Sequence, residues 1–108
     1  MANNDLVPEL TKSEFDNFTK EGLVLIDFFA EWCMPCLTMI PIIEEISEKF
    51  KGKVKFGKID VSEHQDIAQK FGVMSIPNFV LLKNGKLTEQ IMGAIPQEDL
   101  EKILQKHL

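Results

Sequence analysis

The sequence contains no arginine, and its 12 basic residues are outnumbered by 17 acidic ones, which gives a net charge of -5 over 108 residues. Proteins that neutralise several phosphates usually carry a basic face, on which arginine makes paired hydrogen bonds. Here the lysines alternate with Glu and Asp along most of the chain. The composition therefore argues against a nucleic-acid partner and favours a surface that keeps a small protein soluble.

Long apolar runs are also lacking, since no segment approaches the ~20 apolar residues that a membrane span requires. The first ten residues have neither the basic nor the apolar region of a secretory leader. We therefore expect a cytoplasmic protein with no membrane partner. The 6 glycines and 5 prolines are scattered, which excludes collagen-like and disordered chains. The length predicts a single domain over residues 1–108.

Cysteine is scarce, and both copies, Cys33 and Cys36, lie in one short motif. In the cytosol thiols are usually kept reduced, so such a pair is more often reactive or metal-binding than structural. A zinc site needs about four ligands, and His64 and His107 offer no matching spacing. We therefore predict neither a metal site nor a bound cofactor.

The apolar pattern predicts an α/β sandwich. Helices and strands alternate and are followed by a hairpin, which favours a mixed sheet with helices on both faces. A short strand is expected near 6–7, followed by a helix that a capping box opens at 11–14 and that ends near Gly22. A strand over 23–30, a helix from 33 to about 50 and a strand over 53–60 follow. The rest of the chain is expected to form a short helix over 62–71 capped by Ser62, a hairpin over 79–92 that turns at Asn84-Gly85, and a helix that begins at Pro96.

The spacing of the two cysteines predicts redox chemistry. With Cys33 capping a helix and Cys36 in its first turn, both thiols share one face and can form a disulfide. Unpaired N–H groups at the helix end lower the pKa of Cys33, while burial keeps Cys36 protonated. Pro35 suits the first turn, where its missing N–H costs nothing. We expect Cys33 at the exposed mouth of the helix, attacking a disulfide, and Cys36 beneath it, resolving the mixed disulfide.

The segment Asp27-Phe28-Phe29-Ala30-Glu31-Trp32-Cys33-Met34-Pro35-Cys36 closely resembles the active-site segment of thioredoxins. The resemblance continues, in order and at family spacing, through Pro41, Lys58-Ile59-Asp60, Ile76-Pro77, Lys83-Asn84-Gly85 and Gly93-Ala94. It implies the thioredoxin fold, with a mixed five-stranded sheet flanked by four helices. It also implies that the protein reduces protein disulfides and is itself reduced by a thioredoxin reductase.

Two further side chains are candidate catalytic residues. Asp27 is the only charge in its strand, and burial would raise the pKa of its carboxyl. That suits it to accept the proton of Cys36 through water, a role that the resemblance assigns to this position. Lys58 is predicted either to neighbour Asp27 and moderate that shift or to be an ordinary solvated lysine.

The resemblance also implies a substrate-binding surface. It places a cis peptide bond at Ile76-Pro77, which would free the Ile76 backbone to pair with an extended substrate segment. Met74 and Met92 are expected to fill the core or rim. The residues expected to form an apolar surface around Cys33, together with Pro35, are Trp32, Met34, Ile76, Pro77, Gly93 and Ala94.

The sequence departs from the usual thioredoxin pattern at Phe29, Met34, Leu37 and Asn78, where tryptophan, glycine, lysine and threonine are common. Losing a lysine beside the dithiol removes a cation that favours thiolate, and Met34 adds a flexible apolar contact. We expect a monomer that acts on protein substrates. Three alternatives remain open: a glutaredoxin-like, glutathione-dependent reductase, a non-catalytic interaction module, and a metal or cluster scaffold.

Overall fold

The computed structural model of the protein describes residues 6–108. Residues 1–5 lie outside the described residues. They include the start of the expected domain and part of the stretch in which we predicted no leader. The elements follow the order α1 (Lys12–Thr19), β1 (Leu23–Phe29), α2 (Met34–Lys49), β2 (Lys55–Asp60), α3 (Gln65–Lys70), β3 (Asn78–Lys83), β4 (Lys86–Met92) and α4 (Gln97–Lys106).

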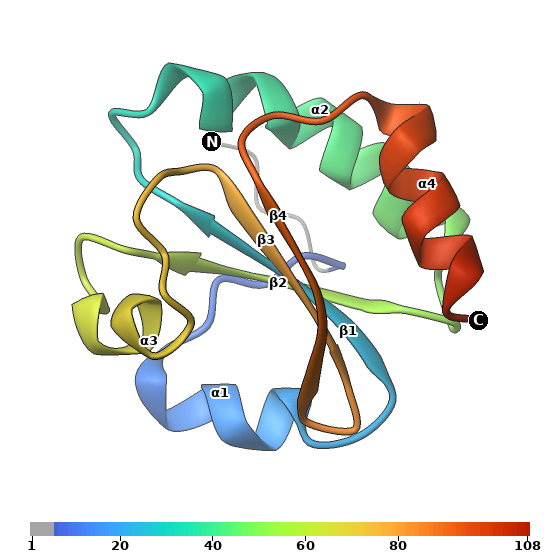
Figure 1. Ribbon diagram of the computed structural model, residues 1–108, viewed down its shortest axis with the longest axis horizontal. Helices are drawn as coiled ribbons and strands as arrows, with labels where there is room; N and C mark the ends of the chain where they lie inside the picture. Colours follow the sequence, from blue (N-terminus) through green and yellow to red (C-terminus); the bar gives the residue numbers. More distant parts are fainter. Residues whose placement is uncertain (1–5) are drawn as a thin grey trace.

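The strands form one mixed sheet in the order β2-β1-β3-β4. Strand β1 pairs in parallel with β2 and antiparallel with β3, and β3 pairs antiparallel with β4. Helices α2 and α4 cover one face of the sheet, and α1 and α3 cover the other (Figure 1). All seven residues of β1 are buried, because an apolar run between two neighbouring strands can be covered on both faces. The predicted α/β sandwich is confirmed.

The described sheet has four strands, so the expectation of five is wrong. The chain before α1 makes only an isolated parallel bridge, in which Lys58 donates its N–H to Pro8 O and Leu10 donates its N–H to Lys58 O. The next hydrogen bond in one direction would need an N–H from Pro8, which proline lacks. In the other direction, the chain turns into α1, which begins at Lys12 with Thr11 as its N-cap. A proline and a helix start therefore limit this segment to one bridge.

The helices begin close to their expected positions, with one exception. Helix α3 has His64 as its N-cap rather than Ser62. Ser62 donates its N–H to Asp60 Oδ1 at 2.8 Å, which makes it part of the turn that leaves β2. Helix α2 is the longest and continues through Pro41. None of the helices within residues 6–108 is long and apolar enough to cross a membrane.

The hairpin between β3 and β4 turns at Asn84 and Gly85, as predicted. Both residues have positive φ, 52° and 82°, which a two-residue hairpin turn of this type requires. Asn84 also accepts the N–H of Gly22 through Oδ1 at 2.9 Å and donates its own N–H to Gly22 O at 2.9 Å. The turn is thus tied to the residue that precedes β1.

We predict that Asn84→Ala lowers the free energy of unfolding by about 1–2 kcal/mol, because alanine is strained at positive φ and cannot accept the Gly22 N–H. Asn84→Gly keeps the backbone conformation and loses only the side-chain hydrogen bond, so its loss should be smaller. Urea unfolding of both variants measures the difference. Equal losses would show that backbone strain contributes nothing at this turn.

Candidate redox site

The turn from β1 into α2 brings Cys33 and Cys36 together. Cys33 is the N-cap of α2 in an extended conformation, with φ -88° and ψ 108°, and its N–H donates to Ala30 O at 3.2 Å. The N–H of Cys36 donates to Cys33 Sγ at 3.2 Å. The two Cα atoms are 5.2 Å apart, and the sulfurs are joined in a disulfide. Pro35 lies in the first turn of the helix, where an N–H would have no partner.

Both cysteines are buried to the same degree, each with 4% of its surface exposed. The expectation that Cys33 is the more exposed of the two is therefore wrong. As an N-cap, Cys33 turns its side chain back over the start of the helix, where it shares a small apolar cluster with Phe29, Ala30 and Cys36, flanked by Val61 and Ile76. Exposure therefore does not distinguish the two cysteines, whereas the hydrogen bond from the Cys36 N–H to Cys33 Sγ does.

A second segment reaches the disulfide from the start of β3. The Ile76–Pro77 peptide bond is cis, and Ile76 O lies 3.8 Å from Cys33 Sγ. Pro77 O accepts the N–H of Gly93 at 2.8 Å, which brings in the end of β4. Gly93 has a φ of 90°, a conformation that favours glycine. Three segments that are distant in sequence therefore meet at the redox pair.

The predicted apolar surface around this point is only partly exposed. Trp32, Met34 and Ala94 are exposed, and Ile76 and Gly93 are half-buried. Pro77 is buried, so its expected place on the exposed surface is wrong: its carbonyl faces Gly93.

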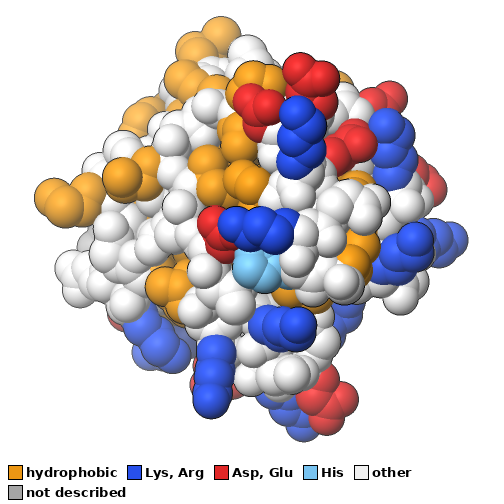
Figure 2. All heavy atoms as spheres, turned by 45° about the vertical axis from the view of Figure 1, so that its right-hand side comes forward, with side chains coloured by type: hydrophobic (Ala, Val, Ile, Leu, Met, Phe, Trp, Pro, Cys, Tyr) orange, Lys and Arg blue, Asp and Glu red, His pale blue; other side chains and the backbone are white. Residues whose placement is uncertain are grey.

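Two methionines that the sequence assigned to the core or rim lie at the surface. Met74 is 93% exposed, and Met92, at the end of β4, is 68% exposed. Ser75 follows Met74 and Gly93 follows Met92, and serine and glycine are typical of turns and loops, so the sequence could have suggested this. Figure 2 shows hydrophobic side chains gathered towards the upper left of the face in view, with lysines below and to the right.

Asp27 and Lys58 face a cavity that reaches Cys36. The cavity has a volume of about 130 Å³, and Asp27, Cys36 and Lys58 line it together with Phe29, Ala30, Glu31, Leu37 and Ile40. Asp27 Oδ1 has no hydrogen-bond partner among the described residues. A cavity of this size with charged side chains in its wall can hold water that satisfies such an oxygen. The space links the buried carboxyl to the resolving position of the cysteine pair.

Burial raises the pKa of the Asp27 carboxyl from 3.8 to about 7, and the charge of Lys58 opposes part of that shift. Lys58 lies opposite Asp27 in the parallel register of β1 and β2, is half-buried, and has its Nζ 5.5 Å from the centre of the Phe29 ring. Of the two predicted environments for Lys58, the structure therefore has the one beside Asp27. A carboxyl with a pKa near neutrality can both accept and return a proton.

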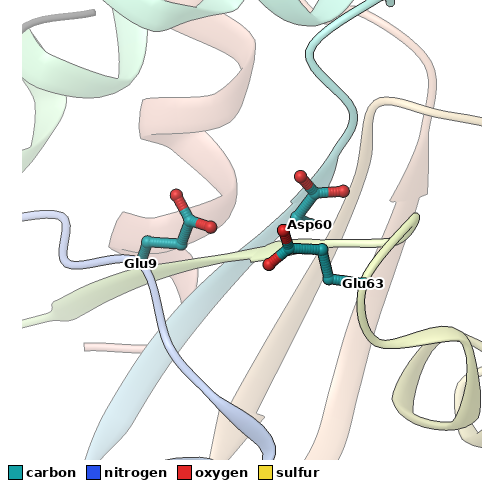
Figure 3. Close-up of side chains that lie close together, drawn as sticks. All are labelled: Glu9, Asp60 and Glu63. Atoms are coloured by element: carbon teal, nitrogen blue, oxygen red, sulfur yellow. The ribbon is translucent and has the colours of Figure 1, made fainter.

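Three carboxylates that sequence reasoning did not group together meet at the end of β2. Oxygens of Glu9, Asp60 and Glu63 lie within 4.8 Å of one another (Figure 3). Glu9 and Glu63 are exposed, and Asp60 already accepts the N–H of Ser62. Their closeness reflects the bridge of Glu9 to β2, and we assign no ligand to them.

Comparison with known proteins agrees with this geometry. The family model described as Thioredoxin matches residues 6–106. A thioredoxin of Bacillus subtilis is 43% identical over 102 residues, which cover 94% of this chain and 98% of the relative. A thioredoxin of Listeria monocytogenes is 42% identical over 103 residues, which cover 95% and 100%.

The same likeness holds for a solved structure, a mutant thioredoxin from Halobacterium salinarum NRC-1. It superposes with a TM-score of 0.83 at 30% identity, covering 93% of this chain and 88% of that one. The similarity therefore extends over nearly the whole chain, in sequence and in fold, and includes a cysteine pair at disulfide distance. The chain belongs to the thioredoxin family and is a thiol–disulfide oxidoreductase.

Proposed function

We propose that Cys33 is the nucleophile and Cys36 the resolving thiol in the reduction of disulfides in other proteins. The Cys33 thiolate attacks one sulfur of the substrate disulfide, which forms a mixed disulfide and releases the other substrate sulfur as a thiolate. The Cys36 thiolate then attacks Cys33 Sγ, which closes the Cys33–Cys36 disulfide and releases the second substrate thiol. The substrate gains two electrons, and the cysteine pair loses two.

The observation that carries this assignment is the position of Cys33 as the N-cap of α2. The Cys36 N–H already points at Cys33 Sγ from 3.2 Å, so a thiolate there gains a hydrogen bond and the favourable field of the helix end. Both effects lower the pKa of a thiol at this position. The Cys36 thiol does not cap the helix: Cys36 lies in the first turn and donates its N–H to Cys33 Sγ.

Asp27 is proposed as the base that takes the proton from Cys36 before it attacks. The supporting observations are the shared cavity, which has room for a bridging water, and the carboxyl pKa of about 7. At that pKa a substantial fraction of the carboxyl is ionised near neutral pH, and the proton can be returned after each cycle. Lys58 contributes by keeping the pKa of Asp27 from rising further.

Substrate is proposed to bind across the exposed end of the site. The half-buried Ile76 lies beside Cys33, so its backbone is placed to pair with an extended chain, as an added strand would. Pro77 fixes the cis turn that directs Ile76. The residues that would offer apolar contact on either side are Trp32, Met34, Pro35, Gly93 and Ala94.

Thioredoxins as a class have disulfide substrates and a thioredoxin reductase as partners, and we propose that such a reductase recycles this chain. We further propose that it acts as a monomer of a single domain in the cytoplasm. The absence of arginine and the mixed lysine and carboxylate surface support a protein that stays unassociated at high concentration.

The cysteine roles predict different outcomes for two matched variants. Cys33→Ser should abolish reduction of an insulin-type protein disulfide, because no nucleophile remains. Cys36→Ser should still attack but should stop at the mixed disulfide, which mass spectrometry of the non-reduced mixture detects. A Cys36→Ser variant that turns over normally would contradict the resolving role of Cys36. A variant with both cysteines changed to alanine that retains full biological activity would favour a non-catalytic interaction module.

The raised pKa of the Asp27 carboxyl predicts that the free energy of unfolding falls as the pH rises. Because its pKa is higher in the folded protein, the folded state holds the proton more tightly than the unfolded chain. The resulting stabilisation is complete below about pH 4 and is lost as the pH rises through about 7. Asp27→Asn should therefore match the wild type at low pH and exceed it at pH 8 by up to about 4 kcal/mol.

The same variant tests the role of Asp27 as a base. The rate of disulfide exchange by the wild type should rise with pH through about 7, and Asp27→Asn should lose that rise. Asp16→Asn changes an exposed carboxyl on α1 and should alter neither profile. An unchanged pH–rate profile in Asp27→Asn would show that Asp27 is not the base in this reaction.

A further inference from the structure

One side chain on β4 holds both ends of the segment that presents Ile76 to Cys33. Gln90 Nε2 donates to Phe71 O at 2.8 Å and to Asn78 Oδ1 at 3.1 Å. Phe71 is the C-cap residue of α3, and Asn78 is the first residue of β3. The chain between them, residues 72–77, is called here the presenting loop. A single amide nitrogen therefore bridges the residue before the loop and the residue after it.

The chemistry of the two amides fixes their orientation. Phe71 O can only accept, so the nitrogen end of the Gln90 amide has to face it, and its two N–H groups serve the two acceptors. Asn78 must then direct its oxygen towards Gln90. This leaves Asn78 Nδ2, on a side chain with none of its surface exposed, without a hydrogen-bond partner in the described part of the chain.

An unpaired buried amide donor lowers stability, so packing alone gives no reason for a polar side chain at this position. The Asn78 oxygen does have a use, since it is the acceptor that completes the bridge from Gln90. The hydrogen-bonded pair of Asn78 and Gln90 is therefore better explained by the loop whose ends it holds than by packing in the core.

The presenting loop is also held by packing and by backbone hydrogen bonds near its ends, since Val73 and Ile76 contact buried clusters. Near α3, Gly72 and Val73 donate their N–H groups to Gln69 O and Ala68 O at 3.0 and 2.9 Å. At the other end Pro77 O accepts the N–H of Gly93. Between these anchors Met74 is 93% exposed. The position of the Ile76 backbone beside Cys33 therefore depends both on the packing of its side chain and on how firmly the two ends of the loop are held at a fixed separation.

We infer that Gln90 and Asn78 are positioning residues for polypeptide substrates: by fixing the presenting loop, they hold the Ile76 backbone ready to pair with an extended segment that flanks the target disulfide. The inference rests on the proposed role of Ile76 in substrate binding. Neither side chain is assigned a contact with the sulfurs, so the chemistry of Cys33 does not depend on them. A small disulfide, which has no backbone to pair, gains nothing from the bridge.

The test compares two substrates in one variant. Gln90→Met keeps the length of an exposed side chain and removes both donors. With the fully reduced protein, the second-order rate constant for a protein disulfide should fall about three- to tenfold, the equivalent of one backbone hydrogen bond between Ile76 and the substrate. The rate constant for a small aromatic disulfide should stay at the wild-type value. Amide hydrogen exchange should quicken in residues 72–76 and stay unchanged in β1.

Two further variants control the comparison. Thr88→Val removes a hydrogen bond of the same kind from β4, the one from Thr88 Oγ1 to Leu81 O at 2.8 Å, and should change neither rate. Gln90→Glu keeps the shape of the side chain but cannot donate to Phe71 O, and should repeat the selective loss.

Equal losses on both substrates, or no loss on the protein disulfide despite faster exchange in the loop, would overturn the positioning role. Failure of the proposed function would look different, because the wild type itself would then leave the protein disulfide intact.

Discussion

The hydrogen bond from the Cys36 N–H to Cys33 Sγ is the interaction on which the site depends. Every helix leaves N–H groups unpaired at its start, and here a sulfur serves as the cap. An anionic sulfur is a better acceptor than a neutral one, so in the proposed mechanism the helix end that Cys33 caps also favours its thiolate. Fold and reactivity are therefore coupled at one atom. The fully buried strand β1 supports this arrangement by fixing where the helix begins.

A buried carboxyl in the same strand places a second demand on the fold. Asp27 lies in the central strand with an oxygen that no described residue binds, which an apolar side chain would avoid. The sheet accommodates it because β1 is supported on both sides and because a cavity opens towards Cys36. The cavity reduces packing, yet it gives space in which a water could carry a proton between Asp27 and Cys36, which both line it. Under the proposed role of Asp27, stability and proton transfer are therefore in opposition at this residue.

The features predicted from sequence are those set by neighbouring residues. The apolar run of β1, the capping box of α1 and the Asn84-Gly85 turn each act over a few positions, so their patterns are visible in the chain. The Cys-x-x-Cys spacing is equally local. The placement of Lys58 needed the register between β1 and β2, which decided between two predictions that the sequence left open.

Other features depend on contacts between distant segments. The number of strands was overestimated because the effect of Pro8 depends on the register. With Glu9 opposite Lys58, the missing N–H of Pro8 faces β2 and ends the hydrogen-bond ladder. The burial of Cys33 involves Ile76, which is 43 residues away in the sequence and packs against the cysteine cluster. The bridge made by Gln90 joins residues that are 19 and 12 positions away and has no local pattern.

The most direct test of the central claim is the rate at which iodoacetamide alkylates each thiol of the reduced protein as a function of pH, followed by mass spectrometry of the two cysteine positions. Activation by the helix end predicts that Cys33 reacts faster at neutral pH and shows a pKa well below that of an ordinary thiol, while Cys36 reacts appreciably only at higher pH. Equal rates and equal pKa values for the two thiols would contradict the account, because burial does not distinguish the two cysteines and the helix end would then have no effect.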